Sequence, residues 1–430
     1  MCIRDSNKTQ FILNQLYRLN PPGRIELTLD RIKRLLKDLG NPEKKLKNVI
    51  IVGGTNGKGS TIEFLRSILK EKNYSVNVYT SPHVLSFNER INFNGKYIAD
   101  KQFEEYVIKI DKANNGKDIT FYEYISSMAF LAFYENPADF NLIEVGLGGV
   151  GDCAAVFEKP VGQILTSISL DHLEYLGPTI EDIVKNKTGI IKEDTNLVIS
   201  RQKRAIQKII DKEIAKKKTK KYILGEDFQV AKENNRMIFQ DQNSLHDIDL
   251  PKMNGDFQLD NASTAIKMLK SLNIKLDNES INKGIINASI IGRIQIIHKG
   301  NLRNNIHDEN MLILDGSHNE DAGKELSSFL EKLKGKKNIY MIFNMLKSKN
   351  IENYLKYFST LINEIKVIKC DDGFYEIKDA MSKISKLGIH VNPSKNVSSA
   401  LSQFAIQDPE AIIVISGSFR IIGKALELNK

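Results

Sequence analysis

The chain has few cysteines and lacks any long apolar run. Only three of its 430 residues are cysteine, and Cys153 and Cys370 lie far apart without the short spacing of metal ligands. This spacing gives no sign of a cysteine-ligated metal centre and suits a reducing compartment. No apolar run approaches the roughly 20 residues of a membrane span, and the N-terminus lacks the apolar core of a secretory signal. We therefore expect a cytoplasmic protein without membrane contact.

The third cysteine, Cys2, belongs to a hexapeptide that looks foreign to the rest of the chain. Met1–Ser6 reads Met-Cys-Ile-Arg-Asp-Ser, which resembles the translation of an adapter used in preparing sequencing libraries. We interpret these residues, including Cys2, as non-native.

Aromatic residues do not interleave with the abundant lysines. The net charge is +9, but lysine is spread along the whole chain, and a single-strand nucleic-acid platform requires stacked aromatics beside its basic groups. The run 216–221, with five lysines, is typical of a solvated helix end. The composition thus argues against nucleic acid and suits anionic small substrates.

A glycine-rich turn follows a short apolar run near residue 50. Val49–Val52 is β-branched and bounded by glycine, which predicts a buried strand. Ile62, Leu65 and Ile68 then recur at helical spacing. Such a turn points backbone N–H groups and a positive helix end at one spot, which favours phosphate binding. This predicted phosphate loop reads Gly54, Thr55, Asn56, Gly57, Lys58, Gly59 and Ser60. Gly59 separates the lysine from the hydroxyl, unlike the common phosphate-binding pattern.

Strand and helix patterns alternate through most of the chain, which predicts an α/β protein with mostly parallel sheets. The expected strands of a first block are 48–53, 76–80, 141–145, 164–169 and 197–200, and those of a second are 311–315, 339–343, 364–369 and 411–416. Helices are expected over 24–39, 101–112, 122–134 and 260–272, with a small β excursion around 222–250. We expect an N-terminal ATP-binding domain over 1–287, a linker over 288–303 and a C-terminal domain over 304–430.

Polar residues gather where several predicted strands end. Glu144 lies inside an apolar strand, where a carboxylate is costly unless it is paired or binds a metal. Asp171-His172 and Asp315 also follow strands, the position in which open α/β sheets present ligand-binding groups. A structural ion pair between Glu144 and Arg90 is the alternative reading. Together with the phosphate loop, the set favours a functional site.

Eight ordered motifs resemble those of folylpolyglutamate synthases and dihydrofolate synthases, a branch of the Mur ligase superfamily. They are GTNGKGS at 54–60, TSPH at 80–83, NERI at 88–91, EVGLGG at 144–149, DH-x4-G at 171–177, KTGIIK at 187–192, GRIQ at 292–295 and DGSHN at 315–319. The resemblance implies a Mur-ligase-like phosphate-loop domain followed by a Rossmann-like ligase domain. It also implies an ATP-dependent ligase that converts a substrate carboxylate to an acyl phosphate, which the amino group of L-glutamate attacks.

The resemblance assigns residues to ATP. The loop Gly54–Ser60 matches the phosphate cradle, with Lys58 at the terminal phosphates, and Asn261 is implied near the nucleotide. Arg293, Asp315 and His318 match groups that reach ATP from the second domain.

The resemblance also implies two Mg²⁺ sites. Ser81 and Glu144 match ligands of the first metal, oxygen donors as this ion prefers. His172 matches a ligand of the second, where imidazole would also suit Mn²⁺. Lys187 matches a lysine that the family carbamylates, which turns a positive charge into an oxygen ligand.

The chain departs from the family directly after Gly149. The usual Arg-Leu-Asp-Ala-Thr-Asn segment is replaced by Val150-Gly151-Asp152-Cys153-Ala154-Ala155, so only Asp152 remains as a substrate residue. Asn186 replaces the glutamate usual before Lys187. An altered substrate, a weak or inactive paralogue and a local sequence error are three competing explanations.

The first hypothesis is therefore a folate-pathway ligase acting on dihydropteroate, reduced folate or both, with L-glutamate. The alternatives are a Mur-type ligase for another carboxylate acceptor and a catalytically silent ATP-binding protein. The family implies a monomer with small-molecule partners only.

Overall fold

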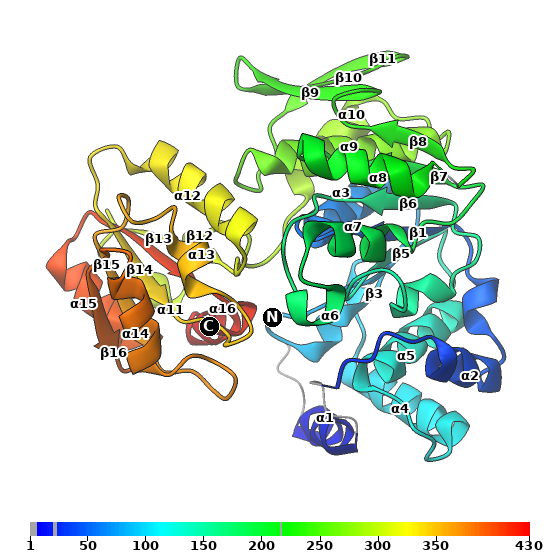
Figure 1. Ribbon diagram of the computed structural model, residues 1–430, viewed down its shortest axis with the longest axis horizontal. Coiled ribbons are helices and arrows are strands. Elements are labelled where there is room, and N and C mark those ends of the chain that lie inside the picture. The colour runs from blue at the N-terminus through cyan, green and yellow to red at the C-terminus, as the bar shows by residue number, and fades with distance from the viewer. Residues whose placement is uncertain (1–6, 20–23, 216) are drawn as a thin grey trace. The chain divides into compact units, whose positions relative to one another are not determined.

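The computed structural model describes residues 7–19, 24–215 and 217–430, which fold into two compact units (Figure 1). In the described part, the N-terminal unit runs to Lys252 and includes Gln258–Ser289, and the C-terminal unit holds Met253–Phe257 and Ile290–Lys430. The hexapeptide interpreted as foreign and Lys216 of the lysine run lie outside the described residues. Among the residues described, no helix has both the length and the apolar character needed to cross a membrane.

An eight-stranded sheet forms the centre of the N-terminal unit, in the order β4-β3-β2-β5-β1-β6-β7-β8. Six neighbouring strands, β2 to β8 in that order, are parallel, and β3 and β4 are antiparallel at one edge. Every residue of β1 and β5 is buried, as expected for central strands covered on both faces. The strands are β1 (Val49–Gly53), β2 (Val76–Tyr79), β3 (Ile91–Phe93), β4 (Lys96–Tyr97), β5 (Phe140–Glu144), β6 (Gly162–Leu165), β7 (Asn196–Ile199) and β8 (Lys220–Ile223).

The helices of this unit bury apolar side chains against the sheet or against one another, and α5 is buried over most of its length. In α5, Thr120 accepts a hydrogen bond from the N–H of Glu123, and Glu123 caps Thr120 in return, which fixes where the helix starts. The helices are α1 (Asn7–Leu19), α2 (Asp30–Asp38), α3 (Lys58–Glu71), α4 (Asp100–Asn114), α5 (Phe121–Glu135), α6 (Leu173–Leu176), α7 (Ile180–Thr188), α8 (Arg204–Ile214), α9 (Phe257–Ser271) and α10 (Asn278–Asn287), with 3-10 turns η1 (Pro42–Lys45), η2 (Phe87–Arg90) and η3 (Cys153–Val156).

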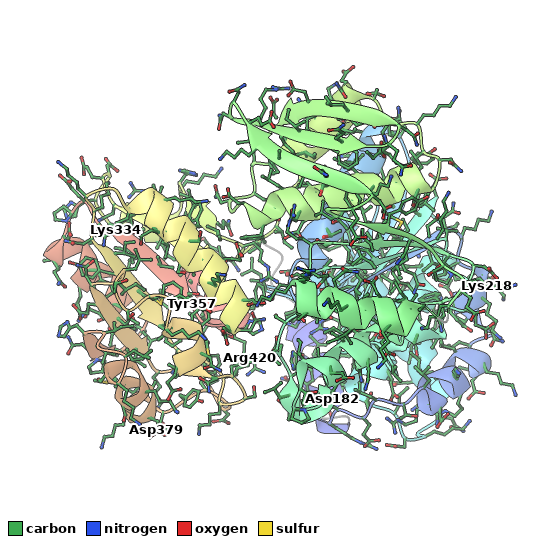
Figure 2. All side chains as sticks on the ribbon, turned by 45° about the horizontal axis from the view of Figure 1, so that its top comes forward. Asp182, Lys218, Lys334, Tyr357, Asp379 and Arg420 are labelled. Atoms are coloured by element: carbon green, nitrogen blue, oxygen red, sulfur yellow. The ribbon has the colours of Figure 1, made fainter. Side chains whose placement is uncertain are left out.

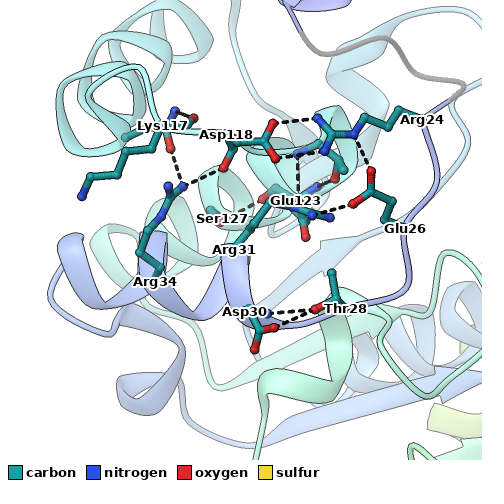
Figure 3. Close-up of polar contacts among 12 residues, drawn as sticks. Arg24, Glu26, Thr28, Asp30, Arg31, Arg34, Lys117, Asp118, Glu123 and Ser127 are labelled. Carbon is teal, nitrogen blue, oxygen red and sulfur yellow. Dashed lines mark hydrogen bonds and ion pairs between the residues drawn. The ribbon is translucent and has the colours of Figure 1, made fainter.

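A charged network ties the segment before α2 to the start of α5 (Figure 3). Arg24 forms a two-pronged pair with Asp118, at 2.6 and 2.9 Å. Arg31 donates to Glu123 at 2.9 Å and to Glu26 at 2.6 Å. The Glu123 side chain is only 3% exposed, so this pair is screened less than the surface pairs around it. The network holds the backbone around Leu27 in place.

A separate antiparallel sheet, in the order β11-β10-β9, lies beside α9 and α10 (Figure 1). Its strands are β9 (Phe228–Glu233), β10 (Arg236–Asp241) and β11 (Ser244–Asp249). Lys267 of α9 donates to Asp241 at 3.0 Å, and both side chains are at least nine-tenths buried. Burial raises the pKa of Asp241, but the hydrogen bonds from Lys267 and from the N–H of Asn243 outweigh it and lower this pKa to about 2. The ion pair thereby couples the small sheet to the helix that carries Asn261.

The C-terminal unit contains a six-stranded sheet in the order β12-β13-β17-β14-β15-β16, parallel except for β12. Helices surround it, and charged side chains such as those of Lys334, Asp379 and Arg420 lie on its surface (Figure 2). The strands are β12 (Gln295–Ile297), β13 (Met311–Asp315), β14 (Ile339–Phe343), β15 (Glu364–Ile368), β16 (Val391–Ser394) and β17 (Ile412–Ser416). The helices are α11 (Asn301–Asn304), α12 (Glu320–Lys334), α13 (Ile351–Leu355), α14 (Ile377–Ser385), α15 (Val397–Gln407) and α16 (Phe419–Leu428).

The predicted α/β architecture with mostly parallel sheets is confirmed, with differences at particular elements. The strand expected over 164–169 is β6, which ends at Leu165, because Ser167 and Ser169 turn to bond the phosphate loop. Much of the expected linker, 288–303, belongs to the C-terminal unit, since Gln295–Ile297 pair with β13. The helix expected over 24–39 begins only at Asp30.

Candidate functional site

The phosphate loop connects β1 to α3 and depends on glycine at two positions. Gly54 and Gly57 have φ values of +135° and +90°, which L side chains rarely adopt. A Cβ at Gly54 would lie 2.0 Å from Thr166 Oγ1, and one at Gly57 would lie 2.4 Å from Asn261 Oδ1. The loop therefore needs glycine both for its backbone conformation and for its close neighbours.

The loop after β6 holds the phosphate loop from the side. The N–H of Thr55 donates to the carbonyl of Ser167 at 2.8 Å. The Thr55 hydroxyl donates to the Ser169 carbonyl at 3.2 Å and accepts from the Ser169 N–H at 3.1 Å. Three hydrogen bonds thus fix Thr55. The first turn of α3 is the positive end of that helix, because the backbone N–H groups of a first turn have no partner within the helix.

Two lysines from different helices converge on one carbonyl of this loop. Lys58 Nζ, at the start of α3, lies 3.4 Å from the Gly54 oxygen and 3.1 Å from the Thr55 oxygen. Lys187 Nζ, near the end of α7, donates to the same Gly54 oxygen at 2.8 Å, and the residue is only 5% exposed. Two positive groups this close favour an anion beside them. The structure thus brings together two residues that the sequence places far apart.

Helix α9 contacts the other side of the phosphate loop. Asn261 is 6% exposed, its Oδ1 lies 3.4 Å from Thr61 Oγ1, and its Nδ2 donates to Gln258 Oε1 at 3.0 Å. Gln258 in turn lies 3.4 Å from Ser60 Oγ. Asn261 therefore lies against the phosphate loop. Gln258 contacts both Asn261 and Ser60 of that loop, which only the fold reveals.

Ser81 and Glu144 meet at the ends of neighbouring strands. Ser81 follows β2 and Glu144 ends β5, and the N–H of Ser81 donates to Glu144 Oε2 at 3.0 Å. Glu144 is 6% exposed. Nearby, Arg90 donates to His83 Nδ1 at 3.0 Å. The Glu144 carboxylate thus lies beside the Ser81 backbone at the carboxyl ends of β2 and β5. A serine hydroxyl and a carboxylate are oxygen ligands of the kind that Mg²⁺ prefers.

His172 lies in the loop after β6 with a neighbouring carboxylate. It has φ +54° and precedes the short helix α6. Its N–H donates to Asp171 Oδ1 at 2.9 Å, and its Nε2 lies 3.9 Å from Asp171 Oδ2. The imidazole is 37% exposed and the Asp171 side chain 8%. Asp171 is not among the predicted metal ligands, but its carboxylate lies beside the His172 imidazole.

No group of three or more His, Cys, Asp or Glu side chains surrounds a metal position in the ranges that the structure describes. The predicted metal ligands also include a serine hydroxyl and a lysine. Only Glu144 and His172 among them are His, Cys, Asp or Glu residues.

Asp152, the predicted substrate residue, is buried behind the loop that follows β5. Its Oδ2 accepts from the N–H groups of Gly146 and Leu147, both at 3.0 Å, and its Oδ1 from that of Ala154 at 2.9 Å. The residue is 2% exposed. Its carboxylate therefore shapes the loop directly. Burial raises its pKa to about 6, against the three backbone hydrogen bonds, which lower it.

The unusual segment around Asp152 fits its surroundings closely. Gly151 has φ +79°, and a Cβ there would lie 2.5 Å from the Leu27 carbonyl oxygen. The N–H of Val150 donates to the Asn186 carbonyl at 3.0 Å. The leucine usual in the family would not fit at Gly151 in this conformation.

The buried carboxylate gives a pH-dependent stability. Asp152 has a folded pKa near 6 against about 3.9 when unfolded. The folded state therefore binds the extra proton, and the stability from this group is lost as pH rises through the folded pKa. We expect the difference in unfolding free energy between wild type and Asp152→Asn to fall by about 1.5 kcal/mol from about pH 5 to 7.5. Urea denaturation of both proteins without nucleotide or metal measures it, and a constant difference would contradict the raised pKa.

The C-terminal unit holds its three predicted ATP residues around two adjoining segments. Asp315 ends β13, and its oxygens accept from the N–H groups of Ser317 and Ile294, both at 2.9 Å. Burial raises the Asp315 pKa, against the Ser317 hydrogen bonds and the charge of Arg293. His318 Nδ1 lies 2.9 Å from the Gly316 oxygen. Asp315 thus joins the residue after Arg293 to the loop that carries His318.

Comparisons with known proteins agree with this arrangement. The Mur ligase middle domain matches residues 52–269, and the dihydrofolate synthetase C-terminal domain matches residues 298–428. The Bacillus subtilis dihydrofolate synthase/folylpolyglutamate synthase is 31% identical over 78% of this chain and 80% of its own length.

Solved structures match nearly the whole chain. Folylpolyglutamate synthase from Thermotoga maritima has a TM-score of 0.82 and 29% identity, over 98% of this chain and 96% of that one. E. coli FolC in complex with DHPP and ADP has a TM-score of 0.87 at 24% identity, over 99% of both chains. The mostly parallel sheet of each unit agrees with these matches. The chain belongs to the dihydrofolate synthase/folylpolyglutamate synthase family of Mur-type ligases.

Proposed function

We propose that this protein uses ATP to join L-glutamate to the carboxylate of a pterin or folate, as a dihydrofolate synthase, a folylpolyglutamate synthase or both. The observation that carries the proposal is the convergence of Lys58 and Lys187 on the Gly54 carbonyl, at 3.4 and 2.8 Å. Lys58 at the glycine turn before a helix suits a polyphosphate, and Lys187 beside it would hold a metal ion once it is carbamylated. Membership of the family supplies the reaction class.

The reaction needs an activated carboxylate, because a free carboxylate is a poor electrophile. A carboxylate oxygen of the acceptor attacks the γ-phosphorus of ATP, and ADP leaves. The amino group of glutamate then attacks the acyl carbon, loses a proton and expels inorganic phosphate. In our assignment the Gly54–Ser60 backbone and Lys58 hold the phosphates, and Arg293, Asp315 and His318 belong to the same reaction. The protein contributes mainly positioning and charge neutralisation.

The residues present fit the metal sites that the family implies. The oxygens of Ser81 and Glu144 would hold one Mg²⁺, and His172 with a carbamylated Lys187 would hold a second metal, Mg²⁺ or Mn²⁺. Metals bound there would neutralise charge on the transferred phosphoryl group. For carbamylation, the Lys187 ammonium first loses a proton. The neutral amine then attacks CO₂, forms an N–C bond and loses a second proton, which replaces an ammonium by an anionic oxygen donor.

The segment Val150–Ala155 bears most directly on which acceptor this protein binds. The arginine, threonine and asparagine usual in this segment are absent, which favours a changed fit to the pterin. We infer a monomer that acts on small molecules and not on nucleic acid; sedimentation at several protein concentrations checks the monomer.

One assay tests the function. Purified protein, ATP, Mg²⁺ and L-glutamate are combined with dihydropteroate or with tetrahydrofolate, and ADP release is followed with each acceptor and without one. Turnover with both supports a bifunctional enzyme, and turnover with one assigns the single activity. If ADP is released with neither acceptor although ATP binds, the folate assignment is wrong, and a Mur-type ligase for another acceptor or a silent ATP-binding protein replaces it.

A further inference from the structure

The aromatic ring of Phe419 lies under the side chain of Arg293. Phe419 is the first residue of α16, directly after the Ser416-Gly417-Ser418 segment that ends β17. The Arg293 Cζ atom lies 4.4 Å from the centre of the Phe419 ring. A guanidinium at this distance from an aromatic face is held by a cation–π contact. The ring therefore supports the planar end of the side chain that we assign to the ATP phosphates.

The same ring also contacts the loop that carries His318. The rings of Phe419 and His318 lie 6.3 Å apart at 71°, an edge-to-face arrangement. A Cβ at Gly316 would lie only 2.5 Å from Phe419 ring carbons, so the ring packs directly on the Gly316 backbone. One side chain thus contacts both segments of the C-terminal unit that carry predicted ATP residues.

The backbone around Arg293 is fixed by other groups. Gly292 has φ +68° and Ile294 has φ +44°, a conformation that a β-branched residue rarely adopts. The N–H of Ile294 donates to Asp315 Oδ2 at 2.9 Å, and the N–H of Gly316 donates to the Gly292 carbonyl at 2.8 Å. Asp315 therefore determines where the Arg293 backbone lies. The long Arg293 side chain can still adopt many rotamers. Contacts such as the one with Phe419 therefore determine its direction.

We propose that Phe419 is a positioning residue that holds Arg293 and His318 in the orientation in which they meet the ATP phosphates. The proposal rests on the proposed function, because the roles of Arg293 and His318 belong to it. Phe419 is only partly buried, unlike the fully buried aromatic residues Phe343, Tyr354 and Phe358 of the same unit. Its contacts with a cation, an imidazole and a glycine backbone distinguish it from a side chain that only fills the core.

A double-mutant cycle between Phe419→Leu and Arg293→Ala tests the proposal. Leucine keeps an apolar side chain but has no π face. We expect Phe419→Leu to lower kcat by about 5- to 30-fold, the equivalent of one cation–π contact. In the Arg293→Ala background the same substitution should have a clearly smaller effect, because only His318 remains of the two groups that Phe419 positions. Phe419→Tyr, which keeps the ring face, should restore most of the rate.

A matched control is available in the same unit. Phe404 is fully buried, stacks on Tyr340 at 4.7 Å and lies under Lys366 Nζ at 5.0 Å. Phe404→Leu removes an aromatic ring and a cation contact without touching Arg293 or His318. We expect it to lower the melting temperature but to leave kcat and the affinity for ATP near those of wild type. Equal losses of kcat in Phe404→Leu and Phe419→Leu would reduce the Phe419 effect to general packing and overturn the proposal.

Two readouts separate this inference from the proposed function. ATP affinity is measured by calorimetry for all variants, and turnover by ADP release. If wild type is active and Phe419→Leu changes neither kcat nor ATP affinity, the inference about Phe419 is wrong and the proposed function stands. A Phe419→Leu loss that persists in full in the Arg293→Ala background also overturns it. If wild type binds ATP but does not turn over, the proposed function fails. In that case the effects of Phe419→Leu and Arg293→Ala on ATP affinity still test the contact: non-additive effects support it, and additive effects refute it.

Discussion

Replacing Lys58 by alanine is expected to lower glutamate-dependent ADP release by about 10²- to 10³-fold, the usual effect of losing one group that stabilises charge in the transition state. Lys58 Nζ lies within 3.4 Å of two loop carbonyls at the start of α3, where the helix end already favours anions. Without its charge, the negative charge that develops on the transferred phosphoryl group is less well compensated. Steady-state ADP release with saturating acceptor and glutamate measures the loss.

Lys70 is the matched control for this experiment. It lies in the last turn of the same helix and is exposed. Lys70→Ala removes an equal charge from α3 at the end away from the loop and should keep turnover within about twofold, because exposed charges contribute little at this distance. Circular dichroism should show both variants folded. A folded Lys58→Ala protein with wild-type turnover would refute the phosphate-loop assignment.

Lys187→Ala is expected to abolish most turnover, by about 10²-fold or more, because it removes either a metal ligand or a charge beside the phosphate loop. Lys187 is 5% exposed and donates to Gly54 at 2.8 Å. An unmodified ammonium at that position would repel the second metal, whereas a carbamate would bind it. Wild-type turnover should therefore fall in CO₂-depleted buffer and recover with bicarbonate.

The matched control is Lys185, two residues earlier on α7, which is exposed and pairs with Glu181 at 3.0 Å. Lys185→Ala should keep both the turnover and its response to bicarbonate. Native mass spectrometry of wild type should detect one added CO₂, which Lys187→Ala should lose. Full activity in CO₂-depleted buffer, with no adduct, would mean that Lys187 acts as an ammonium.

The phosphate loop and most strands could be predicted from the sequence because their signals are contiguous. Met311–Asp315 and Ile339–Phe343 form strands with the expected bounds, since each is an apolar run with clear ends. The strand over 164–169 was predicted too long. Ser167 and Ser169 bond Thr55 instead of extending the sheet, and no local pattern reveals a partner more than one hundred residues away.

Asp152 illustrates a second limit of the sequence. Its place after GLGG predicts a substrate residue, and this role stays a prediction. The sequence does not reveal that the carboxylate accepts three backbone N–H groups or that the residue is only 2% exposed. Burial and hydrogen-bond satisfaction depend on how neighbouring loops pack, which the identity of the residue does not determine.

Local periodicity and short-range spacing are enough to predict the alternation of strands and helices, the glycine turn before α3 and the ordered motifs of the ligase family. Only the packed fold shows that Lys58 and Lys187 share the Gly54 carbonyl, that Asn261 contacts Gly57, and that Phe419 lies under Arg293. These contacts join residues from separate elements, and they form only when buried strands and helices pack and bring distant parts of the chain together.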